Sequence, residues 1–178
     1  MQKIISLVGG IIMNCFAQQL PYVEEPIRPI RSLSEKEIED YLAGAGMGLA
    51  KAAELNHYPG PRHVLDLAAE LQLTVDQISK TQQVFDAMKK EAIRLGIMIV
   101  NEERALDQIF ADQKAEKQAI VSSTTRIARL AGKLRAEHLA AHLAMKDILK
   151  PEQIRKYDEL RGYASQEHDE AQQPLHKH

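Results

Sequence analysis

Residues 73–149 read LTVDQISKTQQVFDAMKKEAIRLGIMIVNEERALDQIFADQKAEKQAIVSSTTRIARLAGKLRAEHLAAHLAMKDIL. Apolar or small residues recur here in alternating steps of three and four, first over residues 78–109 and again over residues 120–148. This is the period of an α-helix and not of a strand, where side chains alternate with period two. No proline lies between Pro61 and Pro151, so each segment can form one continuous helix on the order of 50 Å long at about 1.5 Å per residue.

The polar run ADQKAE at residues 111–116 separates the two periodic segments and is the predicted turn. Glu102 is the one charged residue that interrupts the apolar stripe of the first segment. Each arm has a stripe to bury, so the arms should pack on each other and on shorter helices. We therefore predict an all-α fold, a long antiparallel helical hairpin with flanking shorter helices, with about four to five helices in total.

Residues 1–17 combine a basic start with an uncharged run of apolar and small residues. The run is shorter than the roughly 20 residues that a membrane-spanning helix needs, so a secretory signal peptide cleaved after Ala17 is predicted. Lipidation of Cys15 is a less consistent alternative, because Met13 and Asn14 stand where small residues usually precede such a cysteine. Cys15 is the only cysteine, so the mature chain would contain no disulfide.

The rest of the chain divides by composition. Residues 18–33 contain three prolines among mixed charges, which predicts a flexible linker. The helical domain is predicted over residues 34–164, starting with a capping box formed by Ser34 and Glu37. Residues 165–178 are polar, contain three histidines and are predicted to be a disordered tail.

Three shorter helices are expected in this domain. The first should run from Ser34 to about Leu55, although glycines in a helix interior cost roughly 1 kcal/mol each against alanine. We expect another helix to approach closely where these glycines lie, at Gly44, Gly46 and Gly48. A short helix is predicted over residues 61–72 and a final one over residues 151–164.

Two helix starts share one pattern. Leu73-Thr74-Val75-Asp76-Gln77 places a capping threonine three residues before a glutamine. Leu149-Lys150-Pro151-Glu152-Gln153 repeats this frame, with lysine in place of the threonine and proline at the first helical position.

Two LTxxQ-like starts flanking a long hairpin, behind an export signal, resemble the Spy/CpxP family of periplasmic proteins. The segments GMGL at residues 46–49 and YPGP at residues 58–61, with His63, His138 and His142, resemble its heavy-metal branch, which includes ZraP and CnrX. The resemblance implies a hooked helical hairpin in the periplasm, usually an antiparallel homodimer. It also implies a role in envelope stress, as a chaperone or as a metal-responsive accessory.

His138 and His142 lie one helical turn apart, so both rings project from one face and can supply two ligands to a metal ion. A hydrogen-bonded core histidine at 138 is the alternative. If the two arms pair about the predicted turn, residues near 83–87 lie beside this histidine pair. The link over residues 56–63 should lie at the same open end of the hairpin, so both segments can supply further metal ligands. The candidate metal ligands are His63, His138, His142, His57, Glu54 and Asp86. Nitrogen and oxygen donors without a thiolate favour Zn, Ni or Cu(II).

The chain has 23 basic and 25 acidic residues, and this near balance gives no indication of nucleic-acid binding. The sequence contains no recognisable catalytic motif, so a non-enzyme is predicted. The leading hypothesis is a periplasmic, metal-responsive protein of the heavy-metal resistance or sensor type. The alternatives are an ATP-independent chaperone that holds unfolded client proteins, and a regulatory module that binds a membrane sensor kinase.

A homodimer is predicted as well. Leu139 and Leu143 lie on a flank of the second arm, away from its main apolar stripe. The shorter helices can cover only part of that flank, and an uncovered apolar surface usually marks an interface.

Overall fold

The computed structural model describes residues 28–164, and its regular structure in this range is helical. Within that range, no helix combines the length and the apolar character needed to cross a membrane. The predicted signal peptide, residues 18–27 of the predicted linker and the predicted tail lie outside the described residues. The helices are α1 (Glu35–Ala43), α2 (Lys51–Glu54), α3 (Pro61–Asp66), α4 (Val75–Ala111), α5 (Lys117–Ile148) and α6 (Pro151–Arg161).

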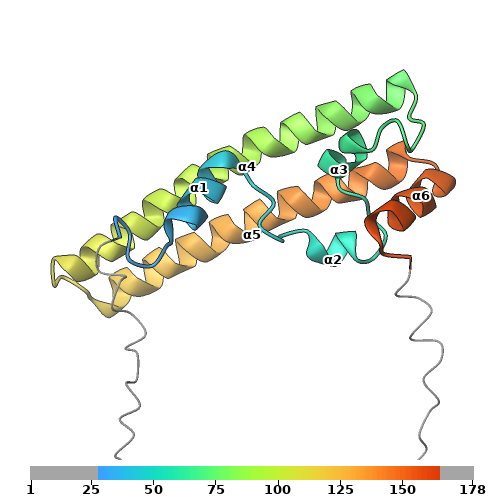
Figure 1. The fold of residues 1–178 in the computed structure, drawn as a ribbon. Helices are drawn as coiled ribbons and strands as arrows, with labels where there is room; N and C mark the ends of the chain where they lie inside the picture. Colours follow the sequence, from blue (N-terminus) through green and yellow to red (C-terminus); the bar gives the residue numbers. More distant parts are fainter. Residues whose placement is uncertain (1–27, 165–178) are drawn as a thin grey trace, which may run out of the picture.

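The two longest helices, α4 and α5, form the predicted antiparallel hairpin, joined by a turn over residues 112–116 (Figure 1). Across the arms, Arg126 Nε donates to Glu102 Oε2 at 2.9 Å, so the charged residue in the stripe is paired. The apolar stripes meet in a core cluster of Ala92, Leu95, Ile99 and Leu134. The prediction of the fold class is confirmed.

Helix α1 packs against α4 at an unusually close approach. Gly96 of α4 is buried, and a Cβ atom added there would lie 2.0 Å from the carbonyl oxygen of Tyr41 in α1. Only a glycine allows the two backbones to come this near. The ring of Tyr41 is consequently held against the hairpin core.

The predicted helix from Ser34 to Leu55 is broken, and this part of the prediction is wrong. Gly44 adopts a left-handed conformation with φ of +59° and ends α1, and Gly48 has φ of +71° in the following loop. Glycine adopts positive φ without steric cost, so the chain turns here instead of continuing as a helix. Since α1 and α2 are separate, the described residues contain six helices and not four to five. The expected close approach occurs at Gly44, which faces Ile93, but the space beside Gly46 and Gly48 is open.

Residues 28–33 also differ from the predicted flexible linker. Ile30 is fully buried and Leu33 is nearly so, and both pack with Val100 of α4. Arg31 forms an ion pair with Asp107 at 2.9 Å. These contacts fasten the segment that precedes α1 to the hairpin.

The shorter helices α3 and α6 end earlier than predicted. Helix α3 stops at Asp66, and residues 67–72 continue as turns. Helix α6 stops at Arg161 because Gly162 adopts a left-handed conformation with φ of +76°.

At the open end of the hairpin, the two helix starts with the LTxxQ-like pattern are joined by hydrogen bonds between their glutamines. We call this pair, Gln77 and Gln153, the glutamine clasp. Gln77 Nε2 donates to Gln153 Oε1 at 2.7 Å and to the Ile148 carbonyl at 2.9 Å. Gln153 Nε2 donates to the Leu71 carbonyl at 3.1 Å. Both side chains are buried, so the clasp links the start of α4, the end of α5 and the start of α6 away from water.

The glutamines of the clasp also cap their own helices. The backbone N–H of Gln77 donates to Thr74 Oγ1 at 3.2 Å. The backbone N–H of Thr74 donates in return to the side-chain oxygen Oε1 of Gln77 at 3.0 Å, which confirms the predicted capping. At the second start, the Lys150 amide donates to Gln153 Oε1 at 2.9 Å. Only this half of the box forms, because a lysine ammonium cannot accept a hydrogen bond.

The approach of α1 to α4 predicts opposite effects for two matched substitutions. Gly96→Ala should lower the free energy of unfolding by about 1–3 kcal/mol, because its Cβ would displace the Tyr41 backbone. Gly132→Ala in α5 meets open space, and should raise it by about 0.5–1 kcal/mol through helix propensity. Urea unfolding measures both, and equal stabilisation would contradict the close approach.

The glutamine clasp predicts a coupling between α4 and α6. Gln77→Ala and Gln153→Ala should each lower the free energy of unfolding by about 2–3 kcal/mol, because buried partners lose their hydrogen bonds. The double variant should cost less than the sum by at least about 0.5 kcal/mol. The exposed Gln83→Ala serves as the control and should change stability by less than about 0.5 kcal/mol in the same urea titration. Strict additivity would contradict the clasp.

Candidate metal centre

A cleft of about 790 Å³ lies between the hairpin arms and the segment from α1 to α3. Both arms contribute to its wall, and the end of α6 closes one side. Figure 1 shows α2, α3 and α6 gathered toward the end of the hairpin that lies away from the turn. The polar and aromatic lining residues used below are Glu54, His63, Phe85, His138, His142, Arg161 and Tyr163.

His138 is the buried histidine of this cleft. The residue is 5% exposed, and its Nε2 atom has no hydrogen-bond partner. Burial lowers the pKa of His138, and the neighbouring His142 lowers it further. The ring is therefore neutral at physiological pH, which is the form that binds a metal ion.

His142 lies one turn further along α5, with one ring nitrogen already engaged. Nδ1 is 2.8 Å from the Tyr58 carbonyl oxygen, to which it donates a hydrogen bond. This arrangement leaves the lone pair on Nε2, as is usual for metal-binding histidines. A Cβ atom at Gly60 would lie 3.1 Å from Nε2, so the glycine keeps space beside that atom.

Glu54 brings a carboxylate to the same place from the end of α2. Its Oε2 lies 3.4 Å from His142 Nδ1, and its side chain is 13% exposed. Its Oε1 accepts hydrogen bonds from the hydroxyl groups of Tyr157 and Tyr163, the second at 3.2 Å. Burial raises the pKa of the Tyr157 hydroxyl, as does its hydrogen bond to Glu54, so Tyr157 remains a donor.

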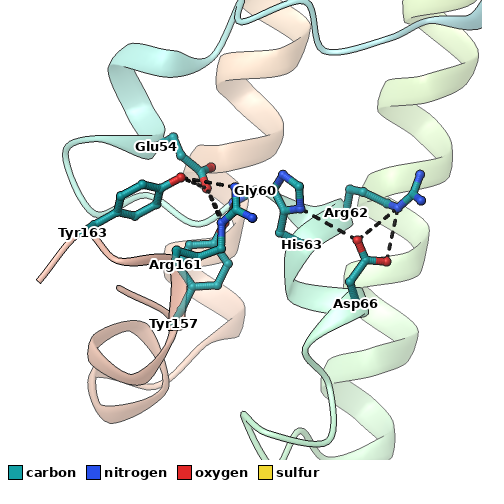
Figure 2. A network of polar contacts seen from close by, with 8 residues as sticks. All are labelled: Glu54, Gly60, Arg62, His63, Asp66, Tyr157, Arg161 and Tyr163. Atoms are coloured by element: carbon teal, nitrogen blue, oxygen red, sulfur yellow. Dashed lines mark hydrogen bonds and ion pairs between the residues drawn. The ribbon is translucent and has the colours of Figure 1, made fainter. Parts of the chain in front are cut away.

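His63 of α3 lines the cleft near this carboxylate (Figure 2). Its Nδ1 is 3.8 Å from Asp66 Oδ2. Burial lowers the pKa of His63, and the positive charge of Arg161 lowers it further. Like His138, His63 is thus a neutral imidazole in the cleft, and it lies near the carboxylate of Glu54.

Two predicted ligands lie elsewhere. His57 faces a separate cleft of about 580 Å³. There its Nδ1 is 2.9 Å from Asp158 Oδ2. Asp86 is exposed on α4 and accepts a hydrogen bond from Gln82 at 2.9 Å. Of the predicted set, the structure brings Glu54, His63, His138 and His142 to one cleft and does not bring His57 or Asp86 there. Within residues 28–164, no three His, Cys, Asp or Glu side chains are already gathered closely enough to hold a metal ion.

Sequence reasoning missed the groups that hold Glu54. Figure 2 shows Tyr157, Arg161 and Tyr163 converging on its carboxylate from α6 and the residues after it. The available signal was the recurrence of hydroxyl-bearing aromatic residues in a helix whose other residues are mostly polar, since a buried tyrosine needs a hydrogen-bond partner.

Comparison with known proteins identifies a family. The model of the LTXXQ motif family protein matches residues 61–161. This range includes both helix starts of the glutamine clasp, the hairpin and the three histidines of the cleft, while Glu54 precedes it. The searches of curated proteins and of solved structures returned no match.

Proposed function

This chain belongs to the LTXXQ motif family, and we propose that it is a periplasmic, metal-responsive protein that binds a divalent transition metal ion in the cleft around His138 and His142. The family corresponds to the Spy/CpxP-like periplasmic proteins, and the predicted signal peptide agrees with that location. The match leaves open which branch of the family the chain resembles most. A binding role, and not catalysis, is part of the proposal.

The observation that carries the proposal is the buried Nε2 atom of His138, which has no hydrogen-bond partner. A buried polar atom without a partner costs about 1–3 kcal/mol, so such an atom in a cleft is a candidate ligand position. His142 adds a nitrogen donor one turn away, with its other nitrogen already oriented by a backbone carbonyl.

The donor set fits a metal of intermediate softness. His138, His142 and His63 offer nitrogen and Glu54 offers oxygen, which suits Zn, Ni or Cu(II). These side chains must move toward one another to complete a coordination shell, since none of the sets in the described residues is preassembled. A bound ion would join α5 to α2 and α3.

Metal titration tests this proposal. With His168, His176 and His178 changed to glutamine in every protein, binding of Zn²⁺, Ni²⁺ and Cu²⁺ should saturate in the low micromolar range or tighter. His138→Ala and His142→Ala should each weaken the affinity by about 10–100-fold. Calorimetry measures the affinities. Gly60→Ala should also weaken binding, because its Cβ would lie against the His142 ring.

The matched control is His57→Ala, because the structure places His57 in the other cleft. This substitution should leave the affinity unchanged. If His138→Ala and His142→Ala bind as tightly as the parent protein, the proposed site is wrong.

Chaperone activity is the second candidate function, favoured by large apolar side chains that are exposed along the hairpin arms. These are Val75, Ile78, Ile97, Met98, Phe110, Val121 and Leu143. Exposed apolar side chains can bury their surface against the apolar segments of unfolded clients. Binding to a membrane sensor kinase has support only from the resemblance.

Exposed apolar residues also support our proposal of a homodimer. Leu143 is 58% exposed on α5, whereas Leu139 is half-buried. Leu143→Glu should shift the protein from twice its chain mass to the monomer in sedimentation, while circular dichroism keeps the same helical signal. Lys133→Glu, a charge change elsewhere on an exposed part of α5, is the control. A parent protein that sediments as a monomer at tens of micromolar would overturn the dimer.

A further inference from the structure

The carboxylate of Glu54 is shared by two parts of the structure. On one side, Arg161 Nε lies 3.6 Å from Oε1, and the Tyr163 hydroxyl donates to the same oxygen at 3.2 Å. We call Arg161 and Tyr163 the latch, because they join the end of α6 to the end of α2 (Figure 2). On the other side, Oε2 faces the ring of His142 at 3.4 Å.

The side chains that line the cleft are mostly basic among its charged residues, and the carboxylate of Glu54 is the exception. Glu54 is the one acidic residue among the described residues that line the cleft, while Lys51, Arg62, Lys89 and Arg161 are basic. Of these cations, Arg161 is the one that forms an ion pair with Glu54. The side chain of Arg161 is 33% exposed, so solvent only partly screens its charge.

We propose that the latch and a divalent metal ion compete for Glu54, so that Arg161 occupies the cation position beside this carboxylate and metal loading releases residues 161–163. This inference rests on the proposed function and adds its regulation. A dication bound by Glu54 and the histidines would repel the Arg161 guanidinium from the same carboxylate. A bound dication would also reduce the negative charge of the carboxylate, which weakens the hydrogen bond that its Oε1 accepts from the Tyr163 hydroxyl.

The release is confined to the end of α6. Tyr157 is fully buried in the core cluster with Val64 and Met145, and Gln153 is held by the glutamine clasp. The first turns of α6 therefore stay in place when Arg161 and Tyr163 leave Glu54. Because coupling between two binding equilibria is reciprocal, a weaker latch must give tighter metal binding.

Two variants in the background without tail histidines test the competition by calorimetry with Zn²⁺. Arg161→Gln should bind about 5–50-fold more tightly than the parent, a range typical of coupled sites. Tyr163→Phe should bind more tightly by a smaller factor, since it removes one neutral hydrogen bond. Arg155→Gln, on the face of α6 that lines the other cleft, should change nothing.

Hydrogen exchange of the parent protein provides a readout that does not depend on affinity. Saturating Zn²⁺ should speed exchange of the amides of residues 161–163 and leave those of residues 153–157 unchanged. If the parent binds Zn²⁺ through His138 and His142, but Arg161→Gln binds equally or more weakly and exchange is unaltered, the competition is wrong and the proposed function stands. A parent that binds no metal would overturn both.

Discussion

The buried hydrogen bonds of the glutamine clasp hold together the end of the molecule where the cleft lies. Gln77 and Gln153 join the start of α4, the end of α5 and the start of α6. This arrangement sets where α6 leaves the hairpin and hence where Tyr157 enters the core. Tyr157 in turn donates to Glu54, so the carboxylate of the cleft depends on the clasp through one intervening side chain.

The hairpin could be predicted because its apolar residues repeat with helix period over two long segments, and many weak signals then agree. The break between α1 and α2 could not be predicted in the same way. Glycine also occurs inside helices, and the left-handed conformation of Gly44 accompanies a close approach to Ile93 of α4, a residue far away in the sequence. The burial of Ile30 was hidden for a similar reason, because a single apolar residue among prolines and charges shows no period.

In the cleft, the pair His138 and His142 was predictable because one regular helix carries both. His57 was misplaced because it lies in an irregular link with φ of +63°, and no periodicity gives the direction of a side chain there. Asp86 was predicted to lie near His138, but the geometry of α4 directs its side chain away from the cleft. It directly follows Phe85, which lines the cleft, and successive residues of a helix point about 100° apart.

The clasp joins glutamines that are 76 positions apart in the sequence. Closing so long a loop is entropically costly, whereas the arms can pair progressively outward from the turn at residues 112–116, where contacts are local. The order of assembly that this favours begins at the turn and ends at the clasp. The cleft is then the last part of the hairpin to take shape during folding, and its walls come together only on a chain that has been synthesised through α6.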